Sequence, residues 1–530
     1  MKQKCLKDIY SYLFWVVALI GICCYTFCFA RNREFWLDEA FLGMNILKRS
    51  YFQLWEPLDL YQVAPPLFLM ISKFFFSIHS YLFLSVEQSL RLYPFLCGIG
   101  SIILFPIVIK KIIKNNLIGL ILYLLFVFNP KIIYYAQEFK QYSSDVFWCL
   151  LVFYVMLKLE FFKFTKRRLF YYGLLFGTLV FLSHMTAFVV LASLGVFFFS
   201  QNCVELTTFK LNKDKVFKLF SFGIGYIVPI FILSVLEFLN PNDSYMHQWW
   251  TQFGAFLRSD LDNLFIIFYD FLDYFLYGDS RAKFSYGVIE HFILYDSVFI
   301  FFWGMLCVPI FLLQGERKKI LFFSLLFLGI ILASYLNLFP TKERSWMYAY
   351  SFFLLGFGVM IDLQKIKILK KIGYFFLWIF LLATAANVTY MMVSYRYEKI
   401  SELRDAVQDL KSLPDDITPV FIVRRRFFRF LNLQDHRAPW WFYKDILNYN
   451  PHEEVLYEEP FDRDNVSINC FSYFNRDLKS GKKYALIWEY EDRSLFKQED
   501  YKLPLDCFVR FGSAQSFQKG GRNIYLWTQK

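Results

Sequence analysis

The chain has 530 residues, of which 57% are hydrophobic and 22% are aromatic, including 68 Phe. One water-soluble core could not bury this much apolar surface, so the composition excludes an ordinary soluble enzyme. The formal net charge is +12, but the basic residues fall in short clusters between apolar runs, as in Lys110, Lys111 and Lys114. This pattern favours a membrane protein with basic inner loops and argues against a nucleic-acid partner.

Apolar runs long enough to cross a ~30 Å hydrocarbon core recur along the chain as far as Val393. They predict a mainly α, polytopic membrane protein with about eleven transmembrane helices. We place these helices near residues 9–30, 89–110, 116–135, 142–162, 169–184, 186–201, 216–239, 292–314, 320–338, 346–362 and 372–394. Because the basic clusters fall in every second connection, the N-terminus is expected in the cytoplasm and the C-terminus outside.

Two domains are expected. Residues 1–394 form the transmembrane domain, with long outer loops at 31–88 and 240–291, and residues 395–530 form a small soluble extracytoplasmic α/β domain. The tail is rich in charged residues, and its runs YALIWEY, CFVRF and NIYLW are typical of strands. Cys470 and Cys507 both fall in this tail, where a disulfide is an open alternative. The ten cysteines lack the spacing of a metal site.

The sequence FWLDEAF, residues 35–41, lies just after the first span, in the first outer loop. Acidic residues at a membrane boundary are commonly solvated loop charges, and that interpretation applies to Asp38 and Glu39. However, these two adjacent carboxylates are flanked by Phe35, Trp36 and Phe41. A partly desolvated carboxylate has a raised proton affinity and can act as a general base toward a hydroxyl group. The pair is therefore a candidate catalytic site.

The outer connection between the third and fourth spans reads NPKIIYYAQEFKQYSSD, residues 129–145. On a helix, Gln137 and Lys140 would share one face, while Glu138 and Tyr142 would share another. Simple solvation accounts for these polar residues. A polar pocket for a sugar and a phosphate accounts for them equally well.

Two more outer positions carry candidate residues. The turn FPTKERSWMY, residues 339–348, places Lys342 and Arg344 outside, against the positive-inside trend. A guanidinium group binds phosphate in a bidentate manner, so Arg344 is a candidate for an anionic lipid headgroup. His184, in FLSHMTAF, lies at the break between two short spans and is either a helix-end residue or a residue that orients the substrate.

The segment YQVAPPLF, residues 61–68, also lies in the first outer loop. Pro65 and Pro66 predict a rigid bend there. The apolar stretch that follows, Leu67 to His79, is only about 13 residues long, so we expect it to lie along the interface or to re-enter the membrane.

Taken in order, these motifs resemble the GT-C membrane glycosyltransferases. The specific resemblance is to the family 39-like group that includes protein O-mannosyltransferases, bacterial aminoarabinose transferases and Rgt-type sugar transferases. It covers residues 10–362. The shared features are an acidic pair after the first span, a Pro-Pro segment, a QE-x-[RK]-x-Y segment opening the fourth span, a central His, and a turn from Pro to Arg near the end.

The resemblance implies transfer of a sugar from a polyprenyl-phosphate donor to an acceptor hydroxyl of a glycan, lipid or protein on the outer face, with inversion. Asp38 would be the general base, with Glu39 shaping the site. The donor and its phosphate would contact Gln137, Glu138, Lys140, Tyr142, His184 and Arg344. Since this chain has Lys140 where Arg is usual, Arg344 is the better phosphate ligand. No cofactor is firmly implied, and the need for a divalent metal is open.

The composition also fits a transporter or flippase of lipid-linked sugars. Such a protein would place charged or helix-breaking residues in mid-span and show related halves, whereas the polar residues here gather at one membrane face. A third interpretation, a scaffold whose tail binds partners, leaves the membrane motifs unexplained. We see no G-x-x-x-x-G-K-[ST] loop for ATP. The expected location is the cell (inner or plasma) membrane.

Overall fold

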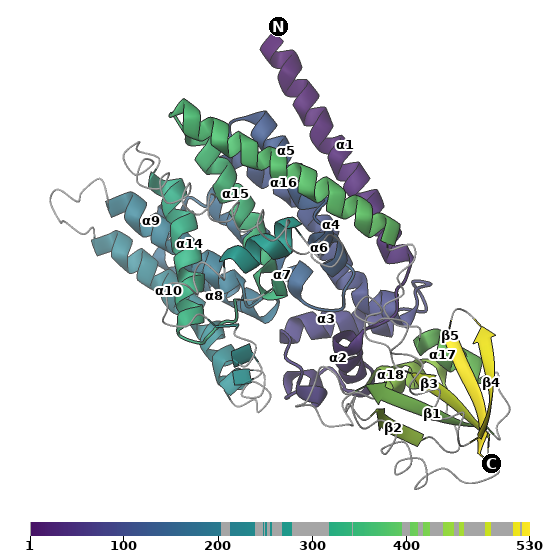
Figure 1. Cartoon of the computed structure of the whole chain (residues 1–530). Helices are drawn as coiled ribbons and strands as arrows, with labels where there is room; N and C mark the ends of the chain where they lie inside the picture. Colours follow the sequence, from purple (N-terminus) through teal and green to yellow (C-terminus); the bar gives the residue numbers. More distant parts are fainter. Residues whose placement is uncertain are drawn as a thin grey trace. The chain divides into compact units, whose positions relative to one another are not determined.

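The structure is a computed structural model of the full chain (Figure 1). It describes residues 2–202, 213–238, 247–248, 250–251, 255–256, 268–277, 317–341, 343–394, 403–411, 417–424, 438–449, 455–459, 483–488, 512–519 and 522–529.

The chain divides into two compact units. The membrane unit comprises Met1–Arg31 and Arg49–Arg396, and the mixed unit comprises Asn32–Lys48 and Tyr397–Lys530. The mixed unit therefore joins a short piece of the chain just after α1 to the C-terminal tail. The domain division at residues 394 and 395 stays a prediction.

The membrane unit is helical. Its α-helices are α1 (Lys2–Ala30), α3 (Pro66–Ser77), α4 (Val86–Ile112), α5 (Asn116–Val127), α6 (Pro130–Tyr135), α7 (Tyr142–Lys158), α8 (Lys166–Thr178), α9 (Thr186–Asn202), α10 (Lys213–Phe238), α14 (Arg317–Tyr335), α15 (Met347–Leu363) and α16 (Lys367–Ser394). Short helical turns occur at η1 (Gln53–Trp55), η2 (Asp59–Tyr61), η3 (Phe161–Lys163), η4 (Leu179–Phe181), η5 (Asp273–Tyr277) and η7 (Glu343–Trp346).

Within the described residues, five helices are long and apolar enough to cross a membrane: Ile9–Ala30, Val86–Ile112, Lys213–Leu236, Arg344–Leu363 and Lys367–Met392. Four shorter apolar helices accompany them. The chain is thus a mainly α, multi-pass membrane protein, as its composition predicted. The span expected at residues 292–314 lies outside the described residues.

Local sequence explains where several helices begin. The side chain of Ser85 accepts a hydrogen bond from the backbone N–H of Gln88, and the side chain of Gln88 accepts one from the backbone N–H of Ser85. This reciprocal pair is a capping box at the N-terminus of α4. The span expected at residues 116–135 is wrong as a single helix. It is broken because Asn129 accepts hydrogen bonds from the backbone N–H groups of Lys131 and Ile132 and so starts α6.

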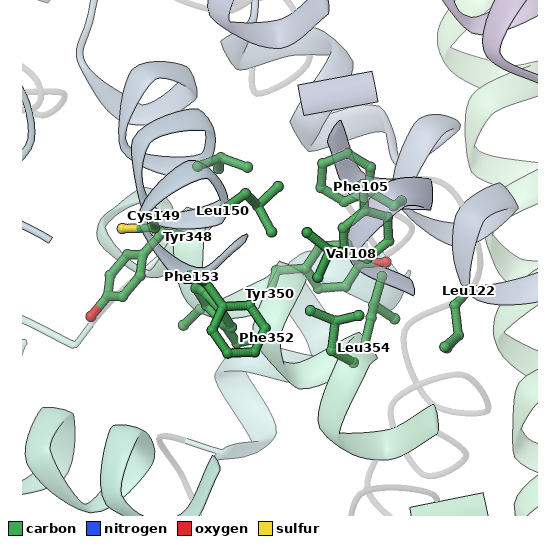
Figure 2. Close-up of a cluster of buried hydrophobic side chains, with 14 of the residues drawn as sticks. Phe105, Val108, Leu122, Cys149, Leu150, Phe153, Tyr348, Tyr350, Phe352 and Leu354 are labelled. Atoms are coloured by element: carbon green, nitrogen blue, oxygen red, sulfur yellow. The ribbon is translucent and has the colours of Figure 1, made fainter. Parts of the chain in front are cut away.

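The core of the membrane unit lies where α4, α5, α7 and α15 meet (Figure 2). The residues labelled there are Phe105, Val108, Leu122, Cys149, Leu150, Phe153, Tyr348, Tyr350, Phe352 and Leu354. Tyr350 donates its hydroxyl to the carbonyl oxygen of Leu125 at 3.2 Å, which links α15 to α5. Because lipid is as apolar as these side chains, packing and such hydrogen bonds, rather than escape from water, hold membrane helices together.

Helices α8 and α10 approach through glycines. A Cβ atom added at Gly173 would lie 2.1 Å from the carbonyl oxygen of Phe222, and one at Gly225 would lie 2.1 Å from that of Phe170. The residues Gly173 and Gly177 form a G-x-x-x-G pattern on α8, which lets two helix backbones come close in a membrane.

We expect Gly173→Ala to destabilise the protein by about 1–3 kcal/mol, because the added methyl group forces α8 and α10 apart. Gly223→Ala on α10 is the matched control, since a Cβ atom there meets nothing within 4 Å. Thermal unfolding of both variants in detergent tests this. Equal melting temperatures for the two variants would contradict the close packing of α8 on α10.

The mixed unit has α and β elements, as expected for the tail. They are α2 (Leu37–Lys48), α17 (Leu403–Lys411), β1 (Ile417–Arg424), α18 (Ala438–Leu447), β2 (Val455–Glu459), β3 (Lys483–Trp488), β4 (Gly512–Lys519) and β5 (Arg522–Gln529). The sheet has the order β2-β1-β3-β5-β4. Strand β1 runs parallel to β2 and β3, while β5 is antiparallel to β3 and β4.

Two of the three strand predictions in the tail are confirmed. The runs YALIWEY and NIYLW overlap β3 and β5. The run CFVRF, together with Cys470 and Cys507, lies outside the described residues.

Candidate functional site

The acidic pair lies at the start of α2 in the mixed unit. Trp36 contributes the carbonyl oxygen that accepts the first helical hydrogen bond, from Ala40. Asp38 and Glu39 therefore occupy the first turn of the helix, where the positive end of the helix dipole favours carboxylates. Asp38 is half-buried, and Glu39 is fully buried. The two neighbours thus meet different environments.

Glu39 is held by charge and by a backbone contact. Its Oε2 atom lies 3.3 Å from a guanidinium nitrogen of Arg33, and the two side chains are 0% and 7% exposed. The same oxygen accepts a hydrogen bond from the backbone N–H of Trp36 at 3.5 Å, as the third residue of a helix does in a capping box. Glu39 therefore fixes the start of α2, and Asp38 is the carboxylate of the pair that solvent or a substrate can reach.

The polar segment between α6 and α7 lies in the membrane unit. Residues 136–141 are not helical, so the expected sharing of helix faces is wrong. The interpretation as solvated loop charges is also wrong, because Gln137, Glu138 and Lys140 are 2%, 1% and 7% exposed. Burying charged groups is costly unless other polar groups surround them. The segment is therefore part of a buried polar site.

Lys140 donates a hydrogen bond from Nζ to Oε1 of Gln62 at 2.7 Å. Gln62 is itself buried and donates to the carbonyl oxygen of Leu60 at 3.2 Å. It comes from the segment YQVAPPLF, just before α3. The Pro-Pro segment thus supplies a residue to the polar site, which the sequence analysis did not identify.

Arg344 and Tyr142 are brought together from distant parts of the chain. The guanidinium carbon of Arg344 lies 5.6 Å from the centroid of the Tyr142 ring, a cation–π contact. Arg344 sits in η7, at the turn before α15. That turn is held by a hydrogen bond of 2.7 Å from the backbone of Thr341 to Ala255 and by one of 2.9 Å from Ser345 Oγ to the Pro340 carbonyl.

Tyr142 belongs to a group of three neighbouring tyrosines. The ring of Tyr142 meets that of Tyr135 edge-on, with centroids 5.3 Å apart, and Tyr135 shares a hydrogen bond of 2.5 Å with Tyr274. The ammonium group of Lys131 lies 4.5 Å from the centroid of Tyr274. We call these five residues the cation–tyrosine cluster. Lys131 and Tyr274 were missed because only packing brings η5 beside α6 and α7.

Asp145 is another residue that the sequence analysis quoted but did not single out. It lies one turn into α7, is 6% exposed, and sits beside the hydroxyl of Ser183. Ser183 precedes His184, which is half-buried at the break before α9. A carboxylate within a membrane helix is a functional-site candidate by default. The position of Asp145 inside a predicted membrane span could therefore have identified it from the sequence.

The membrane unit therefore gathers the polar loop, Arg344 and the break before α9, while Asp38 and Glu39 belong to the mixed unit. An anion suits the cation–tyrosine cluster, because two cations, together with the phenol hydroxyls whose protons the Tyr135–Tyr274 hydrogen bond does not use, can donate hydrogen bonds to it. Among the described residues, no three His, Cys, Asp or Glu side chains gather in the manner of metal ligands.

Comparison with solved structures finds similar chains. The structure is similar to those of ArnT. Two crystal structures of ArnT from Cupriavidus metallidurans, one bound to undecaprenyl phosphate and one in the apo state, each align with a TM-score of 0.46 and 11% sequence identity. The first covers 98% of this chain and 98% of ArnT, and the second covers 99% and 98%.

A scan against protein-family models finds no match, and a search of curated proteins finds none either.

Proposed function

We propose that this protein is a membrane glycosyltransferase that moves a sugar from a polyprenyl-phosphate donor to an acceptor hydroxyl. The observation that carries the proposal is the cation–tyrosine cluster, in which Lys131 and Arg344 lie over Tyr274 and Tyr142. A lipid phosphate needs such cations at the end of membrane helices. The buried Lys140 and Gln62 add donors for the phosphate or for sugar hydroxyls.

The chemistry follows from these roles. The acceptor oxygen attacks the anomeric carbon of the sugar while the bond from that carbon to the phosphate oxygen breaks. Asp38 takes the proton of the acceptor hydroxyl, and polyprenyl phosphate leaves with the bonding electrons. Attack from the side opposite the phosphate inverts the configuration. Cations beside the leaving phosphate stabilise the charge that grows there, which typically contributes several kcal/mol where water is excluded.

Glu39, paired with Arg33, supports the start of α2 in this proposal rather than exchanging protons. Gln137, Glu138, Tyr142 and His184 line the donor region, together with Asp145. The proposed placement is the cell (inner or plasma) membrane, with a cytoplasmic N-terminus and the α/β domain of residues 395–530 outside. The acceptor is a glycan, a lipid or a protein, and the bilayer delivers the donor.

Sugar transfer from radiolabelled polyprenyl-phosphate sugars by membranes containing the protein tests the proposal. We expect Arg344→Met to lower kcat/KM by about 100-fold or more, since one charged donor to the transition state is lost. Arg344→Lys should retain part of the activity because the cation remains.

Arg167→Met is the matched control. Arg167 also lies over a tyrosine, Tyr171, at 5.9 Å, but in the basic first turn of α8, where we place no substrate. Its removal should leave transfer unchanged. Equal losses in the Arg344→Met and Arg167→Met variants would contradict the phosphate site. A protein that transfers no sugar from any donor, yet moves the donors between leaflets, would instead be a transporter.

A further inference from the structure

The helix that carries Asp38 packs against a helix of the C-terminal tail within the mixed unit. The backbone N–H of Phe35, three residues before Asp38, donates a hydrogen bond to the hydroxyl of Tyr443 at 2.7 Å. This bond is buried and joins residues 408 positions apart. A buried backbone N–H without a partner is costly. The Tyr443 hydroxyl of α18 therefore satisfies a backbone group just before α2 begins.

Aromatic packing adds to this bond. The rings of Phe35 and Phe442 are stacked with centroids 4.8 Å apart, and both side chains are fully buried. On the next turns of α2, Gly43 faces the same ring, because a Cβ atom added there would lie 2.8 Å from Cε2 of Phe442. The helix therefore lies so close to Phe442 that only glycine fits.

Both ends of the segment of residues 32–48 also contact the tail. The guanidinium group of Arg404, in α17, donates two hydrogen bonds of 3.3 Å to the carbonyl oxygen of Asn32. At the far end, Lys48 lies 3.7 Å from Asp445 of α18. This second pair is exposed and contributes little. The part-buried contact at Asn32 and the buried contacts at Phe35 and Gly43 thus define where α2 begins and how it is rotated.

We infer that the C-terminal domain orients the catalytic helix, with Tyr443 and Phe442 as positioning residues for Asp38. The inference rests on the proposed role of Asp38 as general base. A base must lie within hydrogen-bond reach of the proton that it removes, and a displacement of 1 Å can cost about 100-fold in rate. Residues 32–48 contain one short helix, and the tail supplies the surface against which it packs.

A double-mutant cycle in the full-length protein tests the inference. We expect Gly43→Ala to lower kcat for sugar transfer by about tenfold or more, because the methyl group pushes α2 off Phe442. Phe442→Leu should also lower kcat, since the stack on Phe35 is lost. The double variant should be no slower than Phe442→Leu alone, because the shorter side chain leaves room for the methyl group.

The donor KM separates positioning from general damage. The proposed phosphate ligands belong to the membrane unit, so we expect all these variants to keep the donor KM of the wild type. Tyr443→Phe, which removes only the hydroxyl, is a milder second variant. It should also lower kcat and leave the donor KM unchanged. Gly329→Ala is the matched control, because a Cβ atom at Gly329 meets nothing within 4 Å, and its kcat should not change.

Hydrogen exchange of the α2 amides is measured on the same samples. Faster exchange in Gly43→Ala, restored toward the Phe442→Leu level in the double variant, supports the inference even if the wild type transfers no sugar and the proposed function fails. The inference is overturned if the losses in kcat simply multiply, if the donor KM rises together with the loss of kcat, or if α2 exchanges at the wild-type rate in every variant.

Discussion

Replacing Asp38 by Asn is expected to lower kcat for sugar transfer by about 10²–10⁴-fold, the usual contribution of a positioned general base. The amide keeps the shape of the side chain and its place in the first turn of α2, but it cannot take the acceptor proton. Donor binding should stay close to that of the wild type, because the proposed donor contacts do not include Asp38. Transfer of radiolabelled sugar under saturating donor checks both expectations.

Asp59→Asn is the control for this change. Asp59 accepts hydrogen bonds from the guanidinium group of Arg49 at 2.9 and 3.2 Å, and its side chain is 65% exposed. An exposed pair of this kind contributes at most about 1 kcal/mol, so the variant should transfer sugar at the wild-type rate. Equal kcat for wild type and Asp38→Asn, at equal amounts of folded protein, would remove Asp38 from the mechanism.

The second large effect concerns the neighbouring carboxylate. Glu39→Leu is expected to lower the free energy of opening α2 by about 3–5 kcal/mol, because it leaves the buried guanidinium of Arg33 without this carboxylate. Native-state hydrogen exchange of the α2 amides in the full-length protein measures this free energy.

The double variant Arg33→Leu/Glu39→Leu decides between a structural and a chemical role. Replacing both members of a buried ion pair by apolar residues is often neutral or stabilising, so the double variant should recover most of the lost free energy. Sugar transfer should recover with it if Glu39 acts only by fixing the start of α2. Restored stability without any transfer would show that Glu39 itself takes part in the reaction.

Local sequence patterns predicted much of the fold. Apolar runs gave the positions of the five apolar segments long enough to cross a membrane, which lie in α1, α4, α10, α15 and α16, to within about five residues, because the thickness of the hydrocarbon core sets the length of a helix that crosses it. Caps such as Ser85 act over a few residues and so can be read along the chain. The span expected at residues 116–135 proved to be two helices, because such a local signal, Asn129 followed by Pro130, starts a new helix there.

The candidate site was predictable only in part. The sequence identified Tyr142 and Arg344 separately, and it identified Lys140 without its partner Gln62. Whether a charged residue in a connection is solvated or buried depends on which helices close around it, and a single sequence does not contain that information. Gln137 and Glu138 therefore remained equally consistent with solvent and with a pocket until the structure buried them.

The sequence by itself determined that the protein is a polytopic membrane protein, roughly where its long apolar helices lie, and which polar motifs its connections carry, because these depend on hydrophobicity and hydrogen bonds over short separations. Only the tertiary structure decided that Lys140 meets Gln62, that Arg344 lies over Tyr142, and that α2 rests on Phe442 and Tyr443. Each of these contacts joins residues far apart in the chain, so it depends on how whole helices pack rather than on any local pattern.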